Sequence, residues 1–331
     1  MDKPSFVSLQ VINTCNLRCV QCDYHQEHLG ESRLSIEEQC ELVRQIGAWD
    51  RNIRLKITGG EPFLEKDRLF AVLEQGAGKG LTTFFLTNAT LIEPDDIRRM
   101  LDLGLGCISV SLDSHNPAVH DAMRGSPGVW HKVERFLREF TAMRSQRGAG
   151  TKLWASTILT RQNLDCLEEL VIAYEELGFD AIKFQPLFPN YRRQYSEGWK
   201  QASPLYPTRD EVEHGFSQLT ALRERHPILD QSTDHIQKMR RYLLDDVGSD
   251  SILCDIMNKV MIVDCDGNVR FCFQQDPKMQ FCTVMPECEP NVRQRGLQDI
   301  WEQSAPLRAR MQHECHRPCS LLWDRVRDIP R

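Results

Sequence analysis

The sequence of 331 residues predicts an α/β protein built from six parallel βα units, arranged as a partial barrel or as a doubly wound sheet. Short apolar runs alternate with amphipathic stretches from the N-terminus to about residue 190. The connections between the runs are long enough for crossover helices. Six units are too few for a closed eight-stranded barrel. In either arrangement, the chemistry is expected at the C-terminal ends of the strands.

The expected strands are apolar or β-branched runs bounded by polar residues, Gly or Pro. They cover residues 6–13, 53–58, 82–87, 107–112, 153–159 and 181–185. Helical patterns lie at residues 35–49, 67–76, 94–103, 129–143, 164–177, 209–225 and 235–244. Ser35 followed by Glu38 predicts a capping box at the first helix. Gly47, Gly104 and Gly178 are expected at helix ends.

Composition excludes several classes of protein. Lys and Arg number 41 against 47 Asp and Glu, a formal net charge of −6, so there is no basic excess for general nucleic-acid binding. Hydrophobic residues make up 41%, which excludes disorder as the main state. No apolar run is long enough to span a membrane, and the first residues lack the pattern of a signal peptide. We therefore expect a cytoplasmic protein.

The pattern changes near residue 253, where short β-like runs rich in Cys begin. This change predicts two domains, one over residues 1–250, with its core at 5–186, and a smaller one over residues 251–331. Residues 187–207 form an irregular segment, either a surface crossover or a loop that covers the substrate. Its candidate polar contacts are Tyr191, Arg192, Arg193 and Tyr195.

The chain has 13 cysteines, an odd number that argues against a disulfide framework in a cytoplasmic protein. Cys15, Cys19 and Cys22 follow the first strand with the spacing C-x3-C-x2-C. Three thiolates on one loop suit a soft metal or an iron–sulfur cluster. Three protein ligands also leave one metal position open for a substrate or cofactor. The alternative is structural zinc with His25 as the fourth ligand.

This loop resembles the signature of the radical S-adenosylmethionine (radical SAM) superfamily. The resemblance implies a partial (β/α)6 TIM-like barrel and a 4Fe–4S cluster held by Cys15, Cys19 and Cys22, with SAM bound to the open iron. An electron from the cluster would cleave SAM to a 5′-deoxyadenosyl radical that takes a hydrogen atom from the substrate. One departure is Gln21, because the residue before the last cysteine is often aromatic in this family.

Three further motifs match the family in chain order. T-G-G-E-P ends the second strand, L-T-N-A-T the third, and S-V-S-L-D-S-H-N-P followed by H-D-A-M-R-G the fourth. The resemblance implies that the first motif binds the SAM amino group, that Ser111 and Asp113 lie near the ribose and that Arg124 pairs with the carboxylate. The candidate cofactor-binding residues are Gly59, Gly60, Glu61, Pro62, Asn88, Ser111, Asp113, Arg124 and Gln185.

The cysteines of the second domain resemble a SPASM/twitch extension of radical SAM enzymes. Asp266-Gly267 predicts a β-hairpin, and residues 296–301 predict a helix before a closing cysteine pair. The dense cysteine block of a full SPASM domain is absent, so the resemblance implies a twitch form with one auxiliary 4Fe–4S cluster. Its expected ligands are Cys254, Cys272, Cys315 and Cys319. Zinc on the same four thiolates is the alternative.

Six cysteines are left over. Cys265 and Cys282 are candidate hydrogen-atom donors to a substrate radical, and Cys288 has no assigned role. The other three lie within helical or strand patterns and are expected to be small core residues: Cys40, Cys107 and Cys166.

The expected reaction is dehydrogenation of an alcohol on a small polar molecule, such as a sugar, an aminocyclitol or aminoglycoside, or a nucleoside, with the auxiliary cluster accepting an electron. The first strand begins near residue 5, without the leader-binding module of many peptide maturases, which favours this substrate class. An external donor such as flavodoxin or ferredoxin would supply the electron for SAM cleavage. The alternatives are an epimerase with a Cys hydrogen donor, a peptide or protein maturase and, outside enzymes, a zinc-stabilised binding protein.

Overall fold

The computed structural model describes residues 3–22, 24, 32–188, 198–246, 255–272 and 290–314. The chain is an α/β protein with an eight-stranded, mostly parallel sheet, the fold class that the sequence predicts. It divides into two compact units. The first unit comprises Met1–Thr14, Gln26–Phe85 and Ser251–Arg331, and the second comprises Cys15–His25 and Leu86–Asp250. No helix in the described ranges is long and apolar enough to cross a membrane.

The first unit has the strand order β3-β2-β1-β7-β8. Strands β1 (Phe6–Ile12), β2 (Arg54–Gly59), β3 (Thr83–Thr87) and β7 (Val260–Val263) are parallel, and β8 (Val269–Arg270) pairs antiparallel with β7. All seven residues of β1 are buried, as expected for a strand with neighbours on both edges. The predicted hairpin is present between β7 and β8, with Gly267 at φ +91°.

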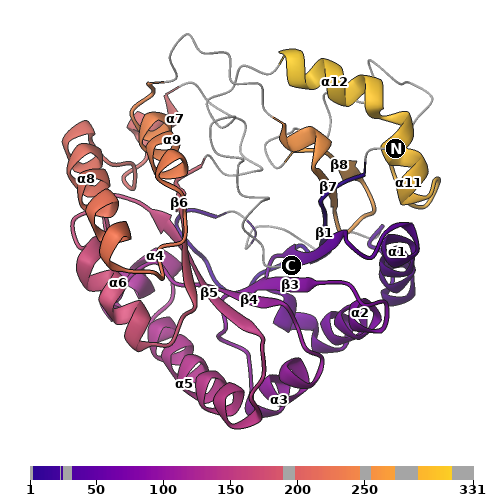
Figure 1. The fold of residues 1–331 in the computed structure, drawn as a ribbon, viewed down its shortest axis with the longest axis horizontal. Helices are drawn as coiled ribbons and strands as arrows, with labels where there is room; N and C mark the ends of the chain where they lie inside the picture. Colours follow the sequence, from indigo (N-terminus) through magenta and orange to yellow (C-terminus); the bar gives the residue numbers. More distant parts are fainter. Residues whose placement is uncertain are drawn as a thin grey trace. The chain divides into compact units, whose positions relative to one another are not determined.

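Two helices of the first unit, α1 (Ile36–Trp49) and α2 (Lys66–Gly78), pack against each other beside these strands (Figure 1). The predicted capping box of Ser35 and Glu38 begins α1. Gly47 does not end this helix, because α1 continues to Trp49. A short 3₁₀ helix, η2 (Pro62–Glu65), precedes α2, and another, η3 (Ile256–Asn258), precedes β7. Near the C-terminal end of the described chain come α11 (Leu297–Gln303), at the place where a helix is predicted, and α12 (Ala305–Glu314).

The second unit has the strand order β6-β5-β4, and all three strands are parallel. They are β4 (Cys107–Ser111), β5 (Lys152–Leu159) and β6 (Ala181–Pro186). Its helices include those predicted, α3 (Pro94–Asp102), α5 (Val129–Arg147), α6 (Leu167–Glu176), α8 (Arg209–Arg225) and α9 (Thr233–Leu243), and α5 and α6 flank the strands (Figure 1). Gly104 and Gly178 follow helices with positive φ angles, as predicted.

Two helices of the second unit are absent from the predicted set, α4 (Pro117–Arg124) and the short α7 (Trp199–Ala202). Asn116 caps α4 by accepting the backbone N–H of Ala118, and Pro117 occupies its first turn. Both are ordinary signals for a helix start, but the helix is only eight residues long. It matters because its last residue, Arg124, is a predicted site residue. The predicted loop residues Tyr191, Arg192, Arg193 and Tyr195 lie outside the described residues.

Candidate active site

The cysteine loop opens the second unit directly after β1 in the chain. Cys15, Cys19 and Cys22 are of intermediate exposure. The backbone N–H of Cys22 donates to the carbonyl of Cys19 at 3.1 Å, which turns the loop between these two cysteines. In the described part of the chain, no three His, Cys, Asp or Glu side chains converge as they would around a single metal ion. Ligands of a 4Fe–4S cluster bind separate irons, so a cluster does not require that convergence.

The Cys15 end of the loop is attached to the residues that follow β3. The Asn88 amide nitrogen donates to Asn16 Oδ1 at 2.9 Å and lies 3.9 Å from Cys15 Sγ. Asn16 in turn donates to Thr90 Oγ1 at 2.9 Å. Ala89 has φ +58°, a left-handed conformation in which glycine is less strained. This is the position at which the sequence differs from the frequent family motif T-N-G-T.

The other end of the loop is attached to the C-terminus of α4. Val20 N–H donates to the Met123 carbonyl at 3.0 Å, and Arg124 Nη1 lies 3.9 Å from Cys19 Sγ. Gly125 follows with φ +65°, and a Cβ there would lie 2.1 Å from the carbonyl oxygen of Arg18. Glycine is therefore required at position 125, both for its backbone angle and for the close approach of the loop.

A buried ion pair connects α4 to the end of β4. Arg124 Nη2 lies 2.8 Å from Asp113 Oδ2, and the residues are 7% and 0% exposed. Asp113 Oδ1 accepts the Ile158 N–H at 3.0 Å, and Oδ2 also accepts the Gln21 amide at 3.2 Å. Burial is the largest single influence and lowers the pKa of Arg124, but the nearby groups Asp113 and Cys19 act together in the opposite direction and the pKa is raised. Arg124 is therefore a permanent cation, as a carboxylate ligand would need.

His120 supports Asp113 from the buried side. Its Nδ1 accepts the backbone N–H of Asp113 at 3.2 Å, which assigns the remaining ring proton to Nε2. Burial, followed by the nearby charge of Arg124, lowers the pKa of His120 to about 2. The imidazole is therefore neutral and acts as an acceptor.

Three polar side chains lie at neighbouring places on β4, β5 and β6. Ser111 pairs in register with Ser156, and the Gln185 amide donates to Ser156 Oγ at 3.3 Å. Two of these residues, Ser111 and Gln185, are predicted site residues, whereas Ser156 has no motif around it. The strand register places Ser156 beside Ser111, and the hydrogen bond from Gln185 connects it to β6.

The predicted T-G-G-E-P motif lies in the first unit, where it packs against the end of β1. A Cβ on Gly60 would lie 1.7 Å from the Thr14 carbonyl oxygen, and one on Gly59 would lie 2.0 Å from that of Ile12. Glu61 is 1% exposed, and its Oε1 accepts the backbone N–H of Phe63 at 3.1 Å. Pro62 then starts η2. The two glycines hold the motif against the residue that precedes Cys15 in the chain.

Two of the predicted C-terminal cysteines can be placed. Cys265 follows β7 and is 2% exposed, and its carbonyl accepts the Leu34 N–H at 2.7 Å. Cys272 follows β8 and is 7% exposed. The remaining predicted residues of this part lie outside the described ranges: Cys254, Cys282, Cys288, Cys315 and Cys319. Among the expected core cysteines, Cys40 and Cys107 are buried, whereas Cys166 precedes α6 and is only half-buried.

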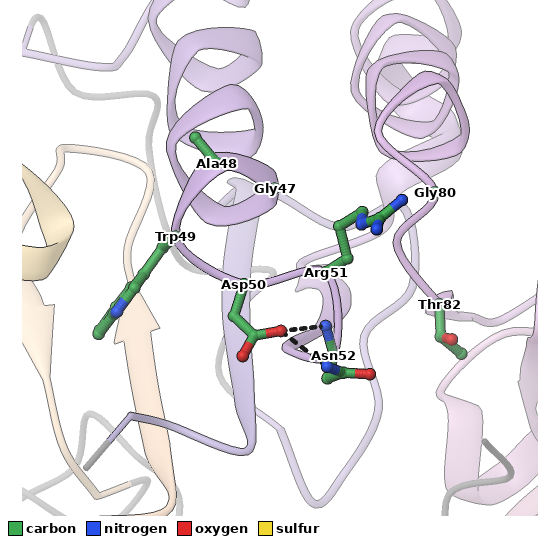
Figure 2. A pocket seen from close by; sticks show the side chains of 8 residues that line it. All are labelled: Gly47, Ala48, Trp49, Asp50, Arg51, Asn52, Gly80 and Thr82. Atoms are coloured by element: carbon green, nitrogen blue, oxygen red, sulfur yellow. Dashed lines mark hydrogen bonds between the residues drawn. The ribbon is translucent and has the colours of Figure 1, made fainter. Parts of the chain in front are cut away.

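The first unit has a polar hollow (Figure 2). It is lined by the end of α1, the turn before β2 and residues that precede β3. Asp50 accepts both the backbone and the side-chain N–H groups of Asn52 there, at 2.7 and 2.9 Å. These residues precede the strands, whereas active sites of parallel βα folds follow them. The hollow is therefore not the candidate active site.

The described residues fit the group that the sequence predicts. The loop presents three thiols of one chemical type, and Arg124 Nε is buried with no hydrogen-bond partner in the described chain. A buried donor without a partner is costly unless a ligand satisfies it, and a carboxylate suits a guanidinium. These are properties of a site for a cluster and a charged cofactor.

Comparison with known proteins defines the class. Residues 9–171 match the Radical SAM superfamily, to which the chain therefore belongs. It is 24% identical over 309 residues to the AdoMet-dependent heme synthase of Methanosarcina barkeri (strain Fusaro / DSM 804), covering 93% of this chain and 84% of that one. It is 23% identical over 315 residues to the mycofactocin maturase MftC of Mycolicibacterium smegmatis, covering 93% and 72%.

The fold is shared with Streptococcus suis SuiB bound to S-adenosylmethionine, with a TM-score of 0.65 at 16% identity, covering 96% of this chain and 69% of that one. Members of the superfamily use a 4Fe–4S cluster and SAM. The protein is accordingly a radical SAM enzyme.

Proposed function

We propose that Cys15, Cys19 and Cys22 hold the SAM-binding 4Fe–4S cluster and that the enzyme oxidises its substrate by removing a hydrogen atom and an electron. The observation that carries the proposal is the attachment of the three-thiol loop at both ends, to Asn88 and to Arg124. When bound, the reduced cluster supplies the electron that splits SAM into methionine and a 5′-deoxyadenosyl radical, which abstracts the hydrogen atom.

The residues around the loop bind and orient SAM in this proposal. Arg124, a buried cation whose Nε has no partner in the described chain, pairs with the SAM carboxylate. Ser111 and Asp113 lie near the ribose, and Gln185 and Asn88 complete the polar lining. The backbone of Gly59, Gly60, Glu61 and Pro62 receives the amino group. Flavodoxin or ferredoxin provides the electron.

We further propose a twitch-like auxiliary 4Fe–4S cluster on Cys254, Cys272, Cys315 and Cys319, which takes up the electron that the substrate radical loses. The hairpin of β7 and β8 and the helix α11 support this assignment, because they occur in the predicted order around Cys272. Cys265 or Cys282 would be the hydrogen donor if the reaction were an epimerisation instead. Cys265 is 2% exposed, which disfavours that role for it.

The substrate is proposed to be a small polar molecule whose alcohol is dehydrogenated. A second candidate is a tetrapyrrole, favoured by the similarity to AdoMet-dependent heme synthases along nine-tenths of the chain. A peptide substrate is the third, because the mycofactocin maturase is similar over the same length. All three oxidations need the same first hydrogen abstraction.

The test is anaerobic reconstitution with iron and sulfide, followed by dithionite reduction with SAM. The expected result is a brown protein that forms 5′-deoxyadenosine. Replacement of Cys15, Cys19 and Cys22 by Ala should abolish SAM cleavage and lower the iron content. Cys40→Ala, a change at a buried helical thiol, serves as the control and should preserve both. A wild-type protein that binds zinc instead and leaves SAM intact would contradict the proposal.

Substrate classes are separated by product mass. Incubation with candidate alcohols, an iron coproporphyrin and a peptide library should yield a product lacking two hydrogens for dehydrogenation of an alcohol, or one lacking carbon dioxide and two hydrogens for oxidative decarboxylation of a carboxylate side chain. Incorporation of one solvent deuterium without other change would identify an epimerase. Cys272→Ala should lower the iron content while leaving some SAM cleavage, whereas unchanged iron would contradict the auxiliary cluster.

A further inference from the structure

Gln21 occupies the loop position between Cys19 and Cys22, and its side chain does not point to solvent. Its amide nitrogen donates to Asp113 Oδ2 at 3.2 Å. Its Oε1 is buried and has no hydrogen-bond partner within the described ranges. A carboxamide with one group bonded and the other enclosed is held in a single orientation, because rotation would exchange the donor for an acceptor facing a carboxylate.

Asp113 connects Gln21 to the thiol of Cys19. The same oxygen that accepts the Gln21 amide also accepts Arg124 Nη2 at 2.8 Å. Arg124 then lies with Nη1 3.9 Å from Cys19 Sγ. Cys19 and Gln21, two positions apart on the loop, are therefore joined into a ring through the side chains of Asp113 and Arg124. The Val20–Met123 backbone hydrogen bond of 3.0 Å lies within this ring.

The ring has an electrostatic consequence for a cluster on Cys19. Asp113 attracts Arg124, and Cys19 competes for the same guanidinium through a different nitrogen. A second donor on Asp113 Oδ2 satisfies part of the carboxylate charge, so Arg124 is drawn less strongly away from the sulfur. Hydrogen bonds to cluster thiolates stabilise the more negative, reduced state and raise the reduction potential.

We propose that Gln21 is a positioning residue for the SAM-binding cluster: by sharing Asp113 with Arg124, it keeps Arg124 donating to Cys19. The inference rests on the proposed function, because it needs the cluster on Cys19. It assigns a role to the one loop position where this chain departs from the aromatic residue frequent in the family. A phenylalanine ring there could not donate to Asp113, so the function of Gln21 would differ from that of such a residue.

The test compares reduction potentials of the reconstituted full-length enzyme. Gln21→Met has nearly the same length but no donor, and Gln21→Phe introduces a ring, again without a donor. In both variants the equilibrium constant for one-electron reduction of the SAM-binding cluster should fall about tenfold, equivalent to a potential lower by about 59 mV. Electron paramagnetic resonance, with SAM added to identify the signal of this cluster, follows the titration. Gln146→Met, at an exposed position on α5, is the matched control and should leave the potential unchanged.

The outcomes separate the two levels of inference. Wild-type protein without a SAM-responsive cluster signal would contradict the proposed function itself. A normal wild-type signal, with Gln21→Met and Gln21→Phe both at the wild-type potential, would overturn the role of Gln21 alone. If one variant fails to fold, as judged by circular dichroism, the other decides the result. The SAM-induced change of the signal should also be altered in the variants, and an identical change would count against the proposal.

Discussion

The buried carboxylate of Asp113 is the most sensitive point of the site. It accepts three donors: the Ile158 N–H at Oδ1, and the Arg124 and Gln21 nitrogens at Oδ2. Asp113→Asn keeps the size of the side chain but replaces one oxygen by an NH₂ group. In either orientation of the Asn amide, its NH₂ group faces at least one of the N–H donors that Asp113 accepts. The buried charge of Arg124 also loses its counter-ion.

Removal of one partner from a buried ion pair costs about 3–5 kcal/mol. Asp113 is 0% exposed and Arg124 is 7% exposed, so solvent cannot compensate and we expect a loss in this range. The assay is urea unfolding of the iron-free chain followed by circular dichroism, with separate fits if the two units unfold in separate transitions. Glu134→Gln is the control, because Glu134 pairs at 2.9 Å with Arg138, whose side chain is 76% exposed, and this pair should contribute less than about 1 kcal/mol.

A double variant isolates the uncompensated charge. Asp113→Asn combined with Arg124→Met removes both ions, so the double variant should be more stable than Asp113→Asn alone. The reasoning would be refuted if Asp113→Asn unfolded within about 1 kcal/mol of the wild type, or if the double variant lost the sum of two independent changes. Either result would mean that Asp113 and Arg124 are solvated or not paired.

Two further predictions concern neighbouring residues. The pKa of His120 is about 2 in the folded state and near 6.5 in the unfolded state, so the contribution of the neutral imidazole to stability is fully present above about pH 6.5 and is lost by up to about 1.4 kcal/mol for each pH unit below it. His120→Gln should remove this part of the pH dependence of the urea unfolding midpoint between about pH 7 and 5. An unchanged pH dependence would contradict a buried neutral imidazole. Gly60→Ala should destabilise the chain by about 1–3 kcal/mol or more, because its Cβ would lie 1.7 Å from the Thr14 carbonyl oxygen. Gly78→Ala on α2 is the control, and because the space around Gly78 is open, this change should be neutral or stabilising by about 0.5–1 kcal/mol. Equal shifts of the thermal unfolding midpoint in the two variants would refute the close approach at Gly60.

Local patterns were sufficient for the strands and most helices. The predicted strand at residues 6–13 is β1 at Phe6–Ile12, and the predicted helix at 209–225 is α8 at Arg209–Arg225. Their periodicity and caps are properties of adjacent residues, which a single sequence displays. The expectation that Gly47 ends the first helix is wrong, because a glycine within a helix and a glycine after one have similar sequence surroundings. Here α1 continues for two more residues, and Lys79 packs against Gly47. The short α4 was missed for lack of length.

The parallel pairing of β7 with β1 could not be predicted in the same way. Phe6 pairs with Val260 and Leu9 with Val263, so the partners are separated by most of the chain. Nothing in the local pattern of residues 260–263 distinguishes a strand of the main sheet from a strand of a separate small domain. The proposed boundary near residue 250 therefore stays a prediction, although the hairpin that follows was recognised from Asp266-Gly267.

The candidate site shows the same division between local and distant information. The positions of Cys15, Cys19 and Cys22 follow from spacing alone, but their attachment depends on Asn88 and Arg124, which lie 73 and 105 positions from Cys15 and Cys19. Family motifs identified these partners, yet they did not show that Arg124 contacts a cysteine as well as Asp113. Nor did they show that Gln21 bonds to the same carboxylate.

Gln21 is a departure from the family pattern when it is considered alone, but with Asp113 and Arg124 around it the departure gains a physical reason. A phenylalanine ring only fills space, whereas a carboxamide also donates a hydrogen bond, which the buried carboxylate accepts at this position. It follows that a substitution at this position should be interpreted together with the residues at 113 and 124 rather than by its similarity to the usual ring.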